Sequence, residues 1–141
     1  MSENYTNLDQ TSLAKLAEEI GGKLKKGDVI ALRGDLGAGK TTFTRHLVNS
    51  LAGSSFDVTS PTFNLVHIYN TKLFDIWHFD LYRLAKSIDL FELGIEEALD
   101  NGVSIIEWPE IAMELLPKNH IDIHITMAED KDLRNITVNY T

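Results

Sequence analysis

One eight-residue segment constrains the fold of this chain more than any other. Residues 34–41 read Gly-Asp-Leu-Gly-Ala-Gly-Lys-Thr and match the phosphate-loop pattern G-x-x-x-x-G-K-[ST] at every fixed position. An apolar run at 28–33 precedes the segment, and a helical pattern at 40–51 follows it. Glycines let the backbone N–H groups of such a loop turn toward phosphates, and the start of the following helix presents further N–H groups to the same anion. The order of strand, loop and helix therefore predicts a nucleoside-triphosphate site in an α/β sheet.

The side chains of this loop have separate expected roles. Lys40 supplies a positive charge to the β- and γ-phosphates, and the Thr41 hydroxyl is a Mg²⁺ ligand. We expect further nucleotide contacts from the neighbouring residues Asp35, Leu36, Gly37, Ala38, Gly39 and Thr42. ATP is favoured over GTP because the sequence contains neither an N-K-x-D segment nor a D-x-x-G switch.

The rest of the chain predicts helices and strands around the loop. A length of 141 residues is that of one domain, so we expect a single P-loop ATPase domain over residues 1–141. Apolar periodicity predicts a helix over 13–24, capped by Asp9 or Thr11, and a second helix over 88–99. Strands are expected at 5–8, 28–33, 65–69, 73–79, 103–106, 121–126 and 136–140. The pattern predicts an α/β fold, namely a P-loop NTPase-like three-layer sandwich with a central mixed sheet flanked by helices.

Charge and composition limit the classes of function. The chain has 13 Lys and Arg against 21 Asp and Glu, a formal net charge of −8, and no Lys or Arg lies between Lys86 and Lys118. Eight acids fall in that interval and carry the whole net charge: Asp89, Glu92, Glu96, Glu97, Asp100, Glu107, Glu110 and Glu114. Such a chain should repel a phosphate backbone, although the acidic run is also compatible with a solvated helix face.

Cysteine and targeting signals give further exclusions. The sequence contains no Cys, which excludes a disulfide scaffold, a thiolate metal site and a cysteine nucleophile. It shows no long uncharged apolar stretch and no signal-peptide pattern at its start. We therefore expect a cytoplasmic protein that does not contact a membrane.

Two acidic residues are candidates for the metal and for the attacking water. Glu107 directly follows the apolar run 103–106 and should emerge at the carboxyl end of that strand, where ligands bind in open α/β sheets. Asp80 ends the second strand of the expected hairpin. We assign Glu107 to the metal with Thr41, and Asp80 to the attacking water or the outer metal shell, so that the catalytic residues are Lys40, Asp80 and Glu107. Simpler interpretations stay open, with Asp80 as a helix cap or a partner of Arg83, and Glu107 as an ordinary surface acid.

His78 and the turn 60–63, both near these acids, are each open to two interpretations. His78 could act as a base, but a lone histidine on a strand is more often packed or solvated. The turn 60–63, Ser-Pro-Thr-Phe, occupies the position of a switch segment, so Ser60 or Thr62 could contact the γ-phosphate, or the turn could be a plain connection. Trp108 places a large ring beside the site, whereas Trp77 is expected in the core.

Four segments in this order and spacing closely resemble the bacterial TsaE (YjeE) family. They are the phosphate loop 34–42, the turn 60–63, the segment 78–84 that reads His-Phe-Asp-Leu-Tyr-Arg-Leu, and the segment 107–110 that reads Glu-Trp-Pro-Glu. The likeness extends from the first helix to Arg134, and it departs at Glu110, where some members have Gln.

The resemblance implies both a site and a role. It implies binding of ATP and Mg²⁺, with Thr41 and Glu107 similar to the metal positions and Asp80 similar to the hydrolysis residue. It also implies that Asp9, Thr11 and Arg134 lie near the nucleotide. The family supports threonylcarbamoyl modification of tRNA adenosine, and its slow, partner-stimulated ATP hydrolysis serves turnover of a TsaB–TsaD heterodimer. Contact with tRNA would then be indirect, and the chain alone would be a monomer or weakly self-associating.

Two other function classes stay open at this point. A small-molecule kinase would need a phosphate-clamping lid and an acceptor site, for which four arginines are few. An assembly switch would need ATP binding without obligatory hydrolysis.

Overall fold

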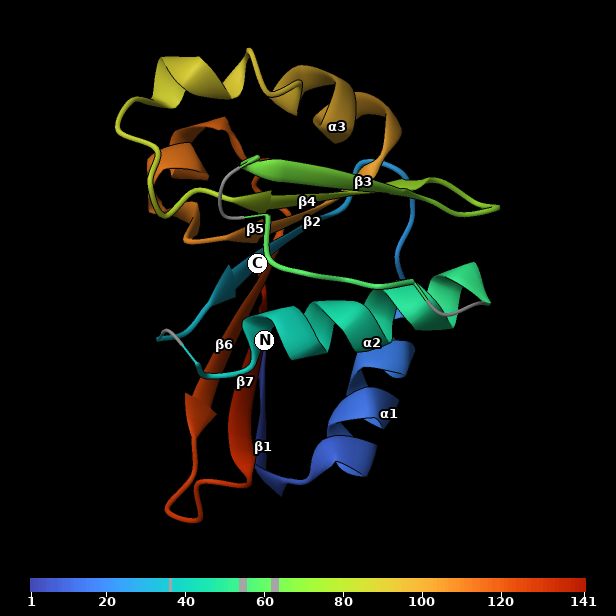
Figure 1. Cartoon of the computed structure of the whole chain (residues 1–141), viewed down its shortest axis with the longest axis vertical. Helices are drawn as coiled ribbons and strands as arrows, with labels where there is room; N and C mark the ends of the chain where they lie inside the picture. Colours follow the sequence, from blue (N-terminus) through green and yellow to red (C-terminus); the bar gives the residue numbers. More distant parts are fainter. Residues whose placement is uncertain (36, 54–55, 62–63) are drawn as a thin grey trace.

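The computed structural model describes residues 1–35, 37–53, 56–61 and 64–141, which form one seven-stranded mixed sheet in the order β1-β7-β6-β2-β5-β4-β3 (Figure 1). The strands are β1 (Ser2–Leu8), β2 (Val29–Arg33), β3 (Val66–Asn70), β4 (Asp75–Asp80), β5 (Val103–Glu107), β6 (Ile121–Met127) and β7 (Arg134–Tyr140). The helices are α1 (Gln10–Gly21), α2 (Lys40–Ala52) and α3 (Ile95–Asn101), with 3-10 turns η1 (Ser87–Leu90) and η2 (Pro109–Leu115).

The centre of the sheet is parallel and its edges are antiparallel. Strand β2 pairs in parallel with β5 and β6, and β4 pairs in parallel with β5. Strand β3 pairs antiparallel with β4, while β7 pairs antiparallel with β6 and β1. All five residues of β5 are buried, as expected for a parallel strand covered on both faces. The expected hairpin, the central parallel strand and the closing antiparallel pair are all confirmed.

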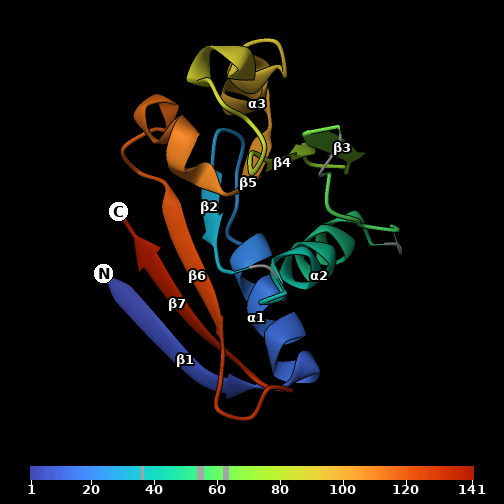
Figure 2. The same ribbon diagram turned by 60° about the vertical axis from the view of Figure 1, so that its left-hand side comes forward.

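Helices cover both faces of the sheet and create two separate cores (Figure 2). Helices α1 and α2 pack on one face around Phe43, Leu47 and Ile105. On the other face, α3, η1 and η2 pack around Phe79, Leu90 and Ile106. The three-layer α/β sandwich predicted from the sequence is therefore confirmed.

The expected continuous helix over 88–99 is wrong. The structure has η1 and then α3, separated by a turn at Gly94 with a φ of +87°. A Cβ atom at this glycine would lie 2.9 Å from Cζ3 of Trp77, so both the backbone angle and the close approach of the indole require glycine. Trp77 itself is buried, as predicted. The helical spacing of apolar residues continues through this break because η1 and α3 bury the same side of the segment.

Other boundaries shift by a few residues. Helix α1 begins directly after Asp9, which is its N-cap, and not after Thr11. It ends at Gly21, whereas the pattern extended to residue 24. Strand β1 is longer than expected and begins at Ser2. No helix within the described ranges is long and apolar enough to span a lipid bilayer.

Candidate functional site

The loop between β2 and α2 forms the tight turn that the sequence predicts. Gly34 follows β2 with a φ of +157°, and a Cβ atom at this position would lie 2.6 Å from the carbonyl oxygen of Ile125 on β6. Helix α2 begins at Lys40 with Gly39 as N-cap, and among the described residues no side chain caps its first N–H groups. These N–H groups, together with the positive end of the helix dipole, therefore face the space in front of the loop.

Lys40 lies at the centre of the site and is 5% exposed. Its Nζ donates a hydrogen bond of 2.5 Å to the carbonyl oxygen of Gly34 and lies 3.8 Å from the ring centroid of Trp108. Burial lowers the pKa of this ammonium, while the nearby carboxylates of Glu107, Asp80 and others act in the opposite direction. The ammonium and the N-terminus of α2 are the groups here that favour a bound polyanion.

Asp80 and Glu107 meet at the carboxyl ends of neighbouring strands. The parallel register of β4 and β5 pairs the two residues directly, and both side chains are buried. Asp80 Oδ2 accepts a hydrogen bond of 2.8 Å from Ser60 Oγ, and its Oδ1 accepts one of 3.1 Å from the backbone N–H of Tyr82. Glu107 Oε2 lies 2.5 Å from His78 Nε2. Neither acid is therefore an ordinary surface residue, and Asp80 does not cap a regular helix.

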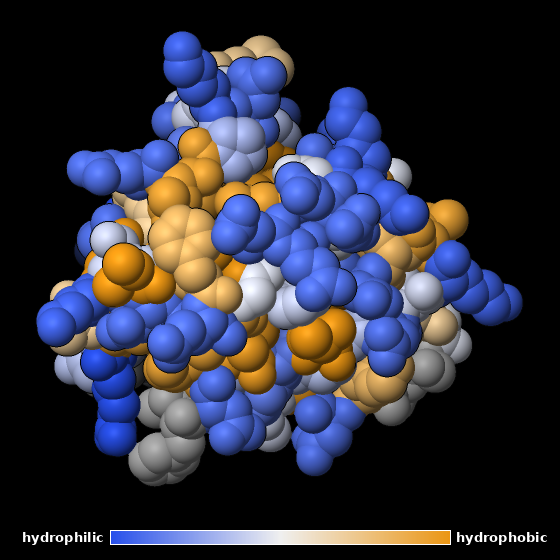
Figure 3. Space-filling model, turned by 90° about the horizontal axis from the view of Figure 1, so that it is seen from above, coloured by the Kyte–Doolittle hydropathy of each residue, from blue (hydrophilic) through white to orange (hydrophobic). Residues whose placement is uncertain are grey.

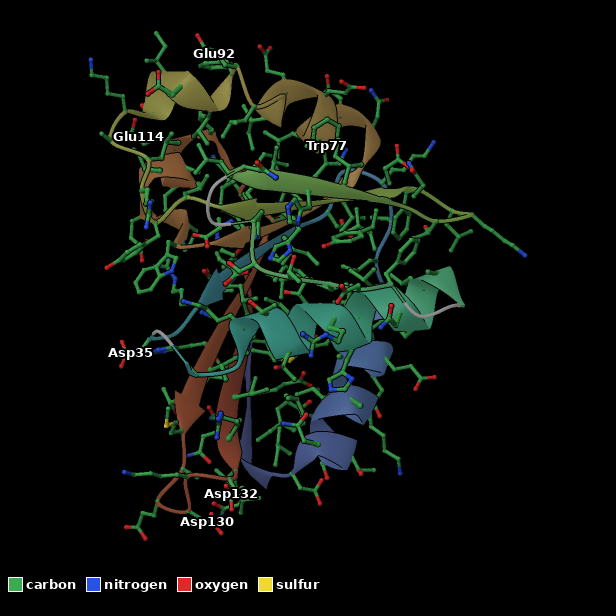
Figure 4. All side chains as sticks on the ribbon, in the orientation of Figure 1. Asp35, Trp77, Glu92, Glu114, Asp130 and Asp132 are labelled. Atoms are coloured by element: carbon green, nitrogen blue, oxygen red, sulfur yellow. The ribbon has the colours of Figure 1, made fainter. Side chains whose placement is uncertain are left out.

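One cleft of about 370 Å³ brings these groups together. It is lined by Gly37, Gly39, Lys40, Thr41, Thr42, Ser60, Asp80, Tyr82, Glu107 and Trp108. Among the loop residues predicted to bind nucleotide, Asp35 and Ala38 do not line this cleft, and the exposed Asp35 side chain points away from the molecule (Figure 4). Leu36 lies outside the described residues, as do Thr62 and Phe63 of the turn 60–63.

Arg134, at the start of β7, contacts the phosphate loop. Its Nε donates a hydrogen bond of 2.7 Å to the carbonyl oxygen of Ala38. Asp9 instead caps α1, where hydrogen bonds from Ser12, above all from its backbone N–H, lower the pKa of the carboxyl group. Thr11 is exposed on the first turn of α1. The structure thus joins Arg134 to the loop, whereas Asp9 and Thr11 do not line the cleft.

Sequence reasoning missed Tyr82 and the partner of His78. The ring of Tyr82 lies 4.8 Å from that of Trp108, so two aromatic rings flank the cleft. His78 is fully buried, in agreement with the packed reading, but its Nε2 contacts Glu107. The available signal was the spacing in the strand, because residues 78 and 80 fall on the same face of β4.

The oxygen ligands near the loop are chemically suited to Mg²⁺. Thr41 offers a hydroxyl group and Glu107 a carboxylate, and both line the cleft beside Lys40. Among the described residues, no group of three or more His, Cys, Asp or Glu side chains could hold a metal by itself. Magnesium usually keeps several waters and takes further oxygens from substrate phosphates, so two protein ligands fit this ion.

Three comparisons agree on the relationship of the chain to known proteins. The family model described as "Threonylcarbamoyl adenosine biosynthesis protein TsaE" matches residues 7–136. This chain belongs to the TsaE family. A TsaE protein from Rickettsia bellii is 42% identical over 125 residues, which cover 88% of this chain and 87% of the relative. A TsaE protein from Bacillus subtilis is 41% identical over 114 residues, covering 80% and 70% of the two chains.

A solved structure supports the same conclusion for the fold. The crystal structure of Bacillus subtilis YdiB superimposes with a TM-score of 0.79 at 31% sequence identity. The match covers 99% of this chain and 86% of YdiB. The α/β architecture is thus shared with a solved structure, while the TsaE relationship rests on the family model and the sequence relatives.

Proposed function

We propose that this TsaE-family chain is an ATPase subunit that serves the biosynthesis of threonylcarbamoyladenosine in tRNA. One observation carries the proposal. The phosphate loop with Lys40 lies in the same cleft as Asp80 and Glu107, the two acids at adjoining strand ends. A positive charge and a helix N-terminus can stabilise the phosphates, and two carboxylates can hold the metal and orient a water, which are the roles that transfer of a phosphoryl group to water uses.

The proposed reaction is attack of a water oxygen on the γ-phosphorus of ATP. The new P–O bond forms as the bond between the γ-phosphorus and the β–γ bridging oxygen breaks, giving ADP and inorganic phosphate. Asp80 orients the water through its carboxylate, which Ser60 and the N–H of Tyr82 hold in place. Lys40 stabilises the charge that develops on the phosphate oxygens. Thr41 and Glu107 would hold Mg²⁺, which supplies further charge neutralisation when bound.

We further propose that the TsaB–TsaD heterodimer is the partner and that the contact with tRNA is indirect. Seen from above, the surface formed by η1 and α3 is dominated by hydrophilic side chains with apolar ones between them (Figure 3). Its exposed acids include Glu92, Glu96 and Glu97, and the exposed apolar side chains among them are those of Ile88 and Phe91. A surface of this composition fits a basic protein surface better than a phosphate backbone. By itself the chain would be a monomer or weakly self-associating.

The test is release of phosphate from ATP with and without TsaB–TsaD. The Asp80→Ala variant is expected to keep ADP binding and to lose most of the stimulated turnover. Glu18→Ala is the control, because Glu18 is an exposed acid on α1, away from both the cleft and the surface formed by η1 and α3. Full stimulated turnover in Asp80→Ala would contradict the assigned role.

The same assay separates the two other function classes. A nonhydrolysable ATP analogue that supports many rounds of tRNA modification would favour an assembly switch. Transfer of the γ-phosphate to a metabolite, with no release to water, would favour a small-molecule kinase.

A further inference from the structure

We infer that His78 is a positioning residue that orients the carboxylate of Glu107 toward the nucleotide cleft. The inference rests on the proposed function, because it concerns the residue that would hold Mg²⁺. Among the described residues, His78 is not part of the cleft lining, and its side chain contacts Glu107, through which it would act.

The contact between the two side chains is short and shielded from water. His78 Nε2 lies 2.5 Å from Glu107 Oε2, and the two side chains are 0% and 3% exposed. A carboxylate accepts hydrogen bonds, so the contact assigns the imidazole hydrogen to Nε2. Since Oε2 is engaged by the ring, the carboxylate is fixed in one orientation while Glu107 still lines the cleft.

The sheet explains why this histidine reaches this glutamate. In the β4–β5 register, His78 is opposite Ile105 and Asp80 is opposite Glu107. Side chains at alternate positions share a face of the sheet, so the residues 78, 80, 105 and 107 all point to the α1–α2 side. The backbone of Glu107 is fixed too, because its carbonyl accepts a hydrogen bond of 3.1 Å from the N–H of Leu81. His78 fixes the remaining rotatable part of the glutamate.

Packing alone does not account for an imidazole at this position. Buried polar groups are usually hydrogen-bonded, because an unpaired one loses its water contacts without compensation. Within the described part of the chain, Nδ1 of His78 is buried and has no hydrogen-bond partner. An apolar side chain would avoid this cost. The benefit of the ring therefore lies in its other nitrogen, which contacts Glu107.

The geometry also excludes direct proton transfer by His78 in the cleft. The ring is fully buried, and it is not among the residues that line the cleft. We therefore infer that His78 orients Glu107, and not that it acts as the base considered from the sequence. Partners of metal ligands have this effect elsewhere, since they fix ligand orientation, and their loss typically lowers metal affinity or activity about 10- to 100-fold.

The first test measures how strongly Mg²⁺ enhances nucleotide binding. The affinity for ADP is determined by calorimetry in EDTA and in Mg²⁺ for the wild type, His78→Leu and His78→Gln. We expect His78→Leu to keep its affinity in EDTA and to lose about tenfold or more of the enhancement by Mg²⁺. His78→Gln, which keeps an N–H donor, should recover part of it. The control is His67→Leu, because His67 is opposite His78 on β3 and its hydrogen-bond contact is with Tyr69.

The second test needs no nucleotide and no turnover. In ¹⁵N-histidine-labelled protein, the Nε2–H of His78 should give a downfield, exchange-protected signal. Glu107→Ala should abolish this signal, whereas Asp80→Ala should retain it. Persistence of the signal in Glu107→Ala would show that the bond does not exist and would overturn the inference, even if His78→Leu fails to fold.

The outcomes separate the inference from the proposed function. If the wild type binds ADP with enhancement by Mg²⁺ and folded His78→Leu does the same to the same extent, the inference alone is overturned. If the wild type shows no binding that depends on Mg²⁺, the proposed function fails and the inference fails with it.

Discussion

The ammonium nitrogen of Lys40 lies 3.8 Å from the centre of the Trp108 ring. The same ammonium donates to the carbonyl oxygen of Gly34, at the start of the phosphate loop. Trp108 reaches this place because its backbone is left-handed, with φ 53° and ψ 60°, directly after β5 ends. The phosphates of a bound nucleotide would compete with both contacts for one cation.

Trp108 should therefore report nucleotide binding by its fluorescence. Phosphate binding is expected to draw the Lys40 ammonium away from the indole and to change its emission, since a cation over the ring contributes about 0.5–2 kcal/mol. Titration with ADP measures the change. Trp108→Leu should keep ADP binding by calorimetry and lose the signal, whereas Trp77→Phe should keep both, because Trp77 packs under α3 on the other face of the sheet (Figure 4). Unchanged emission at saturating ADP would contradict the prediction.

The pH dependence of nucleotide affinity should depend on Lys40. Burial lowers the pKa of its ammonium below the ordinary value of 10.5, and a bound phosphate would raise it again. Binding is thus coupled to proton uptake, so affinity should be highest below the lowered pKa and should fall as the pH rises through the alkaline range. Calorimetry of ADP binding over that range measures the slope. Lys40→Arg should flatten it, because the guanidinium stays charged, and an equal slope in both proteins would contradict the assignment to Lys40.

Much of the site could be predicted because its signals are local. The phosphate loop is one contiguous motif, and the apolar run of β5 indicates where Glu107 emerges. The contact of His78 with Glu107 and the contact of Arg134 with Ala38 could not be predicted by the same reasoning, because they join residues 29 and 96 positions apart. Register between strands decides the contact of His78 with Glu107, and the local pattern of one strand does not reveal which residue of the next strand lies opposite.

The break at Gly94 shows a second limit of the sequence pattern. Apolar spacing reports which side of a segment is buried, and η1 and α3 bury the same side. The interruption depends on the approach of Trp77 from β4, 17 positions away along the chain. A tertiary contact of this kind overrides a helical pattern that is locally consistent.

Reversal of charge on α3 should weaken the complex with TsaB–TsaD. In Glu96→Lys/Glu97→Lys, two exposed acids become bases, so association is expected to weaken by about tenfold or more and to lose its salt dependence. Binding of ADP should not change. The matched control is Glu18→Lys/Glu19→Lys, an adjacent exposed pair on α1 with the same change in net charge. Unchanged association of the α3 variant, measured by biolayer interferometry at two salt concentrations, would refute the proposed docking surface.

Arg134 should support nucleotide binding by holding the loop. Arg134→Ala removes the hydrogen bond of 2.7 Å to the carbonyl of Ala38 and is expected to lower ADP affinity. The expected loss is about tenfold, or about 1.4 kcal/mol, close to the value of a hydrogen bond made by a charged group. Lys131→Ala serves as control, because it removes an exposed positive charge from the same turn and leaves the contact with Ala38 intact. Equal affinities of the two variants in calorimetry would contradict the role of Arg134.

Gly34 should be essential for the stability of the fold as well as for the loop. A Cβ atom in Gly34→Ala would meet the carbonyl oxygen of Ile125 at 2.6 Å, and the φ of +157° is one that alanine rarely adopts. We expect a loss of about 1–3 kcal/mol in the free energy of unfolding, measured by urea denaturation.

Gly22→Ala is the control, because this glycine has a φ of −66° and its Cβ would meet nothing closer than 3.5 Å. That variant should be neutral or more stable by up to about 1 kcal/mol. If Gly34→Ala is as stable as the wild type, the backbone of the turn can adjust to a Cβ atom without strain. The close approach of β6 to the loop would then not constrain residue 34.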